Sequence, residues 1–88
     1  MICRRVIVHG RVQGVGFRYA VARTARARGV AGWVRNRPDG AVEAVFEGDP
    51  DAVESLLRLC REGPRSAEVD SVEVVEQGPE GVVGFAVI

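Results

Sequence analysis

A glycine-containing segment that ends in an arginine is the part of this sequence best suited to chemistry. It spans residues 8–18 and reads V-H-G-R-V-Q-G-V-G-F-R. Glycines allow successive main-chain N–H groups to turn to the same side of a loop, and such loops bind anions beside a helix N-terminus. Arg18 adds a planar guanidinium that matches a phosphate. We predict a loop that binds a phosphoryl group, although a tight strand-to-helix turn with a surface arginine would use the same residues.

Two familiar phosphate-binding loops are excluded by the residues present. The P-loop of nucleoside triphosphatases needs a lysine after its last glycine, and the chain contains no lysine. The dinucleotide-binding pattern G-x-G-x-x-G needs a third glycine, but Tyr19 stands at that position after Gly14 and Gly16.

The other reactive side chains are few. His9 could act as a base, but its place inside an apolar segment favours a structural role. Cys3 and Cys60 are too few for a disulfide framework, and the expected topology places them at opposite ends of the fold, so we expect no disulfide. With a single histidine and widely separated cysteines, the sequence has no metal-ligand spacing, and we expect neither a metal nor another cofactor.

Length and composition favour one small domain over residues 1–88. No apolar run approaches the roughly 18 residues of a membrane span, and no signal peptide is recognisable at the start. We therefore expect a cytoplasmic protein that does not contact membranes and is a monomer. Met1 close to the first strand and the end at Ile88 predict a free-standing protein rather than a domain cut from a larger maturation enzyme.

Charge is distributed unevenly, although the formal net charge is zero. Residues 1–38 contain nine arginines and no acidic residue, whereas residues 39–88 contain all twelve acidic residues and three arginines. The arginine-rich part could bind an anionic ligand. The two parts could equally neutralise each other in the folded protein.

The hydrophobic pattern predicts five strands and two helices. Runs of β-branched residues and period-two alternation indicate strands. Helical spacing, with Gly29 after the first helix and Asp49-Pro50 before the second, indicates helices. In chain order these rules give a strand at 4–10, a helix at 17–28, a strand at 30–37, a turn at 38–40, a strand at 41–47, a helix from 50 that ends before Gly63, and strands at 67–76 and 82–88.

This order predicts an α+β fold of the ferredoxin-like, split βαβ type with a short extra C-terminal strand. Right-handed crossovers place both helices on one face of a mainly antiparallel sheet. The strands at 4–10 and 30–37 then run in the same direction, so their ends bring Arg18 and Asn36 together. The last strand is expected to run the same way and to place the Ile88 carboxylate near Arg18. In the strand at 41–47, alternation places Glu43 and Glu47 on the face opposite the apolar residues.

Two long segments have specific motifs, which read G-R-V-Q-G-V-G-F-R at 10–18 and G-W-V-R-N-R-P-D-G-A-V-E at 32–43, and a shorter one reads G-F-A-V-I at 84–88. Together these segments resemble the acylphosphatase family, and the resemblance covers nearly the whole chain. It implies metal-independent hydrolysis of the carboxyl-phosphate bond of acyl phosphates, which gives a carboxylate and inorganic phosphate without a covalent enzyme intermediate.

The resemblance also implies roles for individual residues. In the family, the loop amides and the closing arginine hold the phosphate, and an asparagine at the position of Asn36 orients the attacking water. Without the resemblance, Asn36 would be a turn residue. A leaving carboxylate, whose conjugate acid has a pKa of about 4, needs no general acid, so positioning and charge stabilisation suffice. The implied catalytic residues are Arg18 and Asn36, and the implied phosphate-binding residues are Gln13, Gly14, Val15, Gly16, Phe17 and Arg18.

Two other functions share this pattern. Split βαβ folds also bind RNA through aromatic residues on the sheet, but the chain offers only Trp33, Tyr19 and three phenylalanines and lacks the usual aromatic motif. We therefore expect no nucleic-acid partner. A module that binds a small anion without chemistry is the other alternative, because the fold alone does not specify function. The expected ligands are a small acyl phosphate as substrate and inorganic phosphate as product and competitor.

Overall fold

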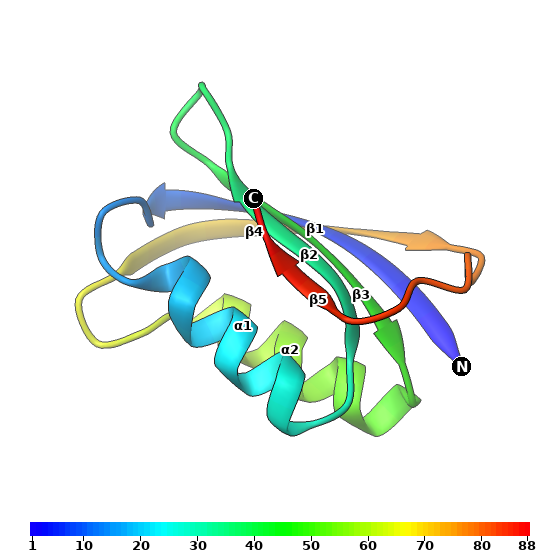
Figure 1. Ribbon diagram of the computed structural model, residues 1–88. Helices are drawn as coiled ribbons and strands as arrows, with labels where there is room; N and C mark the ends of the chain where they lie inside the picture. Colours follow the sequence, from blue (N-terminus) through cyan, green and yellow to red (C-terminus); the bar gives the residue numbers. More distant parts are fainter.

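Two helices cover one face of a five-stranded sheet in the computed structural model, which describes residues 1–88 (Figure 1). The strand order is β4-β1-β3-β2-β5, and every neighbouring pair is antiparallel except β2 and β5. The predicted α+β, ferredoxin-like fold with an added last strand is confirmed. In chain order the elements are β1 (Ile2–Arg11), α1 (Phe17–Ala27), β2 (Ala31–Asn36), β3 (Val42–Gly48), α2 (Pro50–Glu62), β4 (Glu68–Gln77) and β5 (Phe85–Val87).

The predicted and observed elements differ mainly at the C-terminal end. The first six elements begin and end within two residues of the predicted bounds. The last strand was expected at 82–88, but β5 contains only residues 85–87, so this prediction was too long. Gly84 has a φ of 74°, a left-handed conformation that does not occur within a regular strand, so β5 begins at Phe85, although the Gly84 oxygen already accepts a hydrogen bond from the N–H of Gly32 at 2.9 Å.

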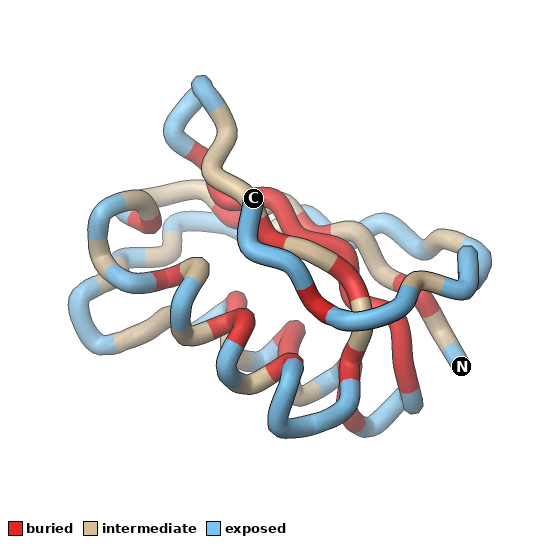
Figure 2. Tube along the Cα trace, viewed as in Figure 1, coloured by how far each residue is buried: buried red, intermediate tan, exposed pale blue.

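The central strand β3 is buried on both faces, and Figure 2 shows the buried residues gathered along the middle of the sheet and on the inner sides of the helices. Val42, Ala44 and Phe46 belong to the core between the sheet and the helices. Glu43 and Glu47 lie on the other face, as alternation predicted, but they are only 2% and 3% exposed. Two acidic side chains are therefore buried on the face without helices.

Two arginines hold the Glu43 carboxylate from both sides. Nε of Arg5 on β1 donates to Oε2 at 2.6 Å, and Nη2 of Arg35 on β2 donates to Oε1 at 2.6 Å. Burial raises the pKa of Glu43, but the hydrogen bonds from Arg35 and Arg5 outweigh it and hold the pKa below its ordinary value. The carboxylate thus ties β1, β3 and β2 together, and these include the strands that lead to the glycine loop and to Asn36.

The Glu47 carboxylate anchors the segment that leads from β4 to β5. It accepts hydrogen bonds from the main-chain N–H groups of Glu80 at 2.6 Å, Gly81 at 2.9 Å and Val82 at 3.1 Å. These bonds lower the pKa of Glu47. Beyond this anchor, Phe85 stacks on Phe46 of β3 with ring centroids 6.0 Å apart. These contacts fix β5 beside β2.

Mutual neutralisation holds for the arginines of the strands but not for those of α1. Arginines of the strands are neutralised by acidic residues of the second half, as in the pairs Arg4–Glu76, Arg11–Glu68 and Arg35–Glu43. The arginines of α1 and its C-terminal cap form no ion pair. These unpaired arginines are Arg18, Arg23, Arg26 and Arg28.

Cys3 on β1 and Cys60 on α2 are both buried and free. Burial raises the pKa of Cys60 to about 12, so its thiol stays protonated and packs as an apolar core residue. Neither α1 nor α2 has the length and apolar character that crossing a membrane requires.

The pairing of Glu43 leads to a prediction about stability. Glu43→Gln leaves Arg5 and Arg35 without their carboxylate, and we expect the free energy of unfolding to fall by about 1–3 kcal/mol at pH 7. Because the folded state lowers the pKa of Glu43, its contribution is present above the ordinary value of 4.5 and is lost as the pH falls through the folded pKa. The difference between wild type and variant should therefore shrink below pH 4.5 in urea unfolding measurements.

Glu62→Gln is the matched control, since Glu62 is exposed and forms no ion pair. It should change the free energy of unfolding little at any pH. A difference between wild type and Glu43→Gln that stays constant from pH 7 to pH 3 would contradict the role assigned to the carboxylate.

Candidate functional site

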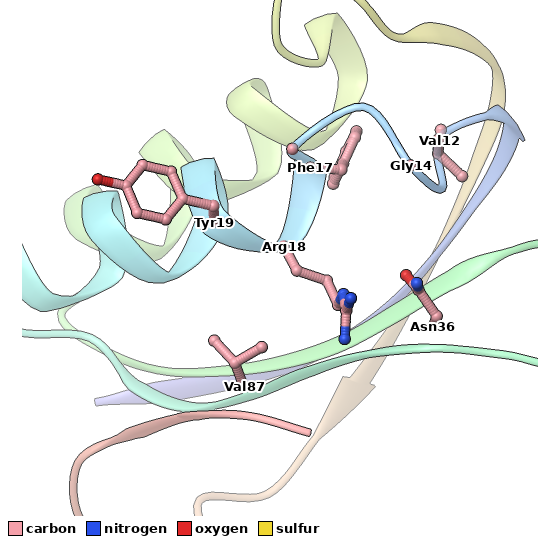
Figure 3. A pocket seen from close by; sticks show the side chains of 8 residues that line it. Val12, Gly14, Phe17, Arg18, Tyr19, Asn36 and Val87 are labelled. Carbon is pink, nitrogen blue, oxygen red and sulfur yellow. The ribbon is translucent and has the colours of Figure 1, made fainter.

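A hollow of about 270 Å³ lies where the end of β1, the start of α1 and the end of β2 meet (Figure 3). None of its lining residues is an aspartate, glutamate, histidine or cysteine. The hollow therefore offers hydrogen-bond donors and one positive charge, a combination that suits a small anion. Its lining residues are Val12, Gly14, Gly16, Phe17, Arg18, Tyr19, Asn36 and Val87.

The loop between β1 and α1 owes its shape to two glycines in the left-handed conformation. Gly14 has a φ of 74° and Gly16 a φ of 78°, and a Cβ at either position would meet no atom within 4 Å. The requirement for glycine is therefore one of backbone conformation and not of space. Another residue with this backbone geometry would destabilise the fold by about 1–2 kcal/mol. Such turns direct neighbouring N–H groups to one side, as an anion site needs.

The main-chain donors of this loop are not used by the protein itself. The N–H groups of residues 13–16 donate to no main-chain oxygen. Gly16 is the N-cap of α1, and no side chain caps the first turn of the helix. The open N-terminus of α1 adds its own unpaired N–H groups and the positive end of the helix dipole. Several donors are thus available at one place for an anionic ligand.

Arg18, the second residue of α1, brings a full positive charge to these donors. Figure 3 shows its side chain extending from the helix into the hollow. Nη1 donates to the main-chain oxygen of Ile88 at 3.1 Å, and the guanidinium forms no ion pair with an acidic residue. The predicted proximity of Ile88 to Arg18 is confirmed, since β5 runs parallel to β2 and ends beside the helix. This contact with the last residue orients the guanidinium, and no acidic side chain pairs with it.

Asn36 reaches the same hollow from the last position of β2. Its backbone pairs with Val42 of β3, and Figure 3 shows its amide pointing into the space that the Arg18 guanidinium also enters. The prediction that the strand ends bring these two residues together is confirmed. A carboxamide carries both a donor and an acceptor, so it can hold a water molecule in a fixed orientation.

Two of the residues predicted for phosphate binding do not line the hollow. Val15 packs against the hydrophobic core. Gln13 is half-buried, and its Nε2 donates to the main-chain oxygens of Arg37 at 2.8 Å and Ala41 at 3.0 Å. For these two residues only the main-chain N–H groups are candidates for contact with an anion.

His9, the one histidine, lies outside the hollow. Its Nε2 is 2.6 Å from Oε2 of Glu73 on β4, which matches the structural role favoured from the sequence.

No group of three or more His, Cys, Asp or Glu side chains is arranged to hold a metal ion. In the turn next to Asn36, the main-chain N–H of Ala41 and the nearby Arg37 lower the pKa of Asp39.

Three lining residues were missed by the sequence reasoning: Val12, Tyr19 and Val87. Tyr19 is 70% exposed although it is aromatic, and Val87 is 46% exposed at the end of β5. An exposed aromatic residue directly after Arg18 was a usable signal, because its place on the outer side of α1 follows from helical spacing. The position of Val87 depends on how β5 pairs, which local sequence does not reveal.

Comparison with known proteins gives one consistent result. A family model described as Acylphosphatase matches residues 4–87. The acylphosphatase of Thermococcus kodakarensis is 57% identical over 81 residues, which are 92% of this chain and 89% of the relative.

Solved structures agree with the sequence comparison. The crystal structure of acylphosphatase from Bacillus subtilis superposes with a TM-score of 0.95 at 43% identity and covers 100% of this chain and 99% of that chain. Full-length HypF, solved in a phosphate- and nucleotide-bound form, contains a similar region with a TM-score of 0.91 and 27% identity. The match covers 99% of this chain but only 12% of HypF.

Proposed function

The chain belongs to the acylphosphatase family, which hydrolyses the carboxyl-phosphate bond of acyl phosphates, and from this we propose that the hollow between β1, α1 and β2 is its active site. The observation that carries the proposal is the meeting of unused loop amides, a guanidinium without an acidic side-chain partner and the Asn36 amide in one small space. An acyl phosphate presents a compact dianion and a good leaving group, and these are the two features that such a site can use.

In the proposed mechanism, the main-chain N–H groups of the loop and the first turn of α1 bind the phosphoryl oxygens. Arg18 neutralises the charge that these oxygens carry in the transition state. The donors are already in place before substrate arrives, so little reorganisation is needed as the bond breaks. Tyr19 and Val87 line the outer part of the hollow, where they can contact the acyl group without recognising its chemistry.

Asn36 holds the attacking water in line with the breaking bond. The water oxygen forms a bond to phosphorus, and the bond from phosphorus to the carboxyl oxygen breaks. The electron pair of that bond leaves with the carboxylate, and both protons of the water remain on the resulting dihydrogen phosphate. A leaving carboxylate needs no proton at neutral pH, which agrees with a hollow lined by no acid and no histidine.

We further infer that the protein is a single domain and acts as a cytoplasmic monomer. Its match to the Thermococcus kodakarensis relative spans most of both chains, and its two cysteines are buried and free. Light scattering of the purified protein should give a mass near 9.5 kDa. A mass of twice this value would contradict the monomer.

Hydrolysis of benzoyl phosphate, with and without a chelator, tests the proposed role of Arg18. Arg18→Ala removes the one charge in the hollow, and we expect kcat/KM to fall by about 10³-fold or more together with the affinity for inorganic phosphate. Arg28→Ala is the matched control, since Arg28 lies at the C-terminal cap of the same helix, is exposed, forms no ion pair and does not line the hollow. The chelator should change neither the rate of the wild-type protein nor that of the control variant. Retention of phosphate affinity in Arg18→Ala would refute the anion site.

A different pattern is expected for Asn36→Ala. If Asn36 orients the water but does not hold the phosphate, kcat should fall by about 10²-fold or more while the inhibition constant for inorganic phosphate changes by less than about threefold. Equal losses in turnover and in phosphate affinity would instead make Asn36 a phosphate ligand. Binding of phosphate by the wild-type protein without any turnover of benzoyl phosphate would favour the alternative of an anion-binding module.

A further inference from the structure

The glycine loop and the strand end that carries Asn36 are not neighbours in the sheet. β3 lies between β1 and β2. The pairing of β1 with β3 ends at Val8 and Val42, so the ladder does not include the loop at residues 12–16. The sheet alone therefore does not fix the distance between the phosphoryl group on the loop and the water on Asn36.

The side chain of Gln13 bridges this gap. Its Nε2 donates to the main-chain oxygens of Arg37 at 2.8 Å and Ala41 at 3.0 Å, so both N–H groups of the carboxamide are used. Gln13 directly precedes Gly14 of the loop, and Arg37 directly follows Asn36. The bridge thus joins the two halves of the site through residues adjacent to them.

The turn to which Gln13 is hydrogen-bonded is held by two further hydrogen bonds. The main-chain N–H of Arg37 donates to the oxygen of Ala41 at 2.8 Å, and Oδ1 of Asp39 accepts from the main-chain N–H of Ala41 at 3.0 Å. Gln13 therefore attaches to the closed end of the β2–β3 hairpin rather than to a mobile strand end. Loss of this attachment would therefore act on the hairpin that carries Asn36.

We propose that Gln13 is a positioning residue that sets the distance between the bound phosphoryl group and the water held by Asn36, without touching the substrate through its side chain. The inference rests on the proposed function of Asn36. A misplacement of about 1 Å at a reacting centre can cost about 10²-fold in rate. Phosphate binding should depend less on the Gln13 side chain, because the loop amides and Arg18 lie together at the loop end of the bridge, whereas Asn36 lies at its hairpin end.

A double-mutant cycle with Asn36→Ala tests this inference. Gln13→Leu keeps the approximate size of the side chain and removes both donors. We expect it to lower kcat for benzoyl phosphate by about tenfold or more, with less than about a threefold change in the inhibition constant for orthophosphate. In the Asn36→Ala background the same substitution should cause almost no further loss, because the group that it positions is already gone.

Gln77→Leu is the matched control, since Gln77 is a half-buried glutamine on β4 that contacts Cys3 and not the hollow. It should leave kcat unchanged. Urea unfolding of each variant separates lost stability from lost positioning, and Gln13→Ala replaces Gln13→Leu in the cycle if the leucine variant does not fold.

An equal loss of kcat from Gln13→Leu in both backgrounds would overturn the inference, because Gln13 would then act independently of Asn36. A rise of the phosphate inhibition constant in proportion to the loss of kcat would also overturn it, because Gln13 would then support the phosphate loop. Both results leave the proposed active site intact. Unchanged turnover in the single variant Asn36→Ala would overturn the role of Asn36 and, with it, this inference.

Discussion

A small dianion is held by hydrogen-bond donors that have nothing else to bind, and this protein leaves such donors free at one place. The left-handed glycines 14 and 16 turn the loop N–H groups away from the rest of the chain, and the uncapped N-terminus of α1 continues the set. N–H groups without a partner in the protein are free to donate to an anion at a helix N-terminus. Arg18 completes the site we propose, because its charge is not compensated by any acidic residue.

The rest of the fold holds these donors and Asn36 in fixed positions relative to each other. Glu43 joins β1, β3 and β2 through two arginines, and Glu47 anchors the segment that delivers β5 to Arg18. The basic first half of the chain is thus neutralised where it forms the sheet and left positive where it forms α1. This division explains how a protein without net charge can present a positive hollow to a phosphorylated substrate.

Sequence patterns predicted the parts of the structure that depend on local chemistry. The helix beginning at Phe17, the turn around Asp39 and the convergence of Arg18 and Asn36 follow from glycine, proline and strand direction, and the structure contains them. The burial of Glu43 could not be predicted in this way, because an acidic residue in an alternating strand is normally solvated. Its burial depends on Arg5, which lies 38 residues away in sequence.

The role of the Gln13 side chain was hidden for the same reason. The motif that contains it predicts a phosphate loop, and nothing in the motif says that the carboxamide turns to the β2–β3 hairpin. The length of β5 was also misjudged, since Gly84 was counted as part of an apolar strand although its conformation interrupts it. For Glu43 and Gln13 the deciding partner comes from a distant segment, which local patterns do not identify.

A crystal structure with orthovanadate, which adopts the geometry of the phosphoryl group during transfer, would show whether the hollow binds the transferring phosphoryl group. We expect one vanadate in the hollow, about 2.7–3.2 Å from main-chain nitrogens of the loop and from the Arg18 guanidinium, with the Asn36 amide facing an apical oxygen. Vanadate bound at another surface, or an Asn36 side chain directed away from that oxygen, would contradict it.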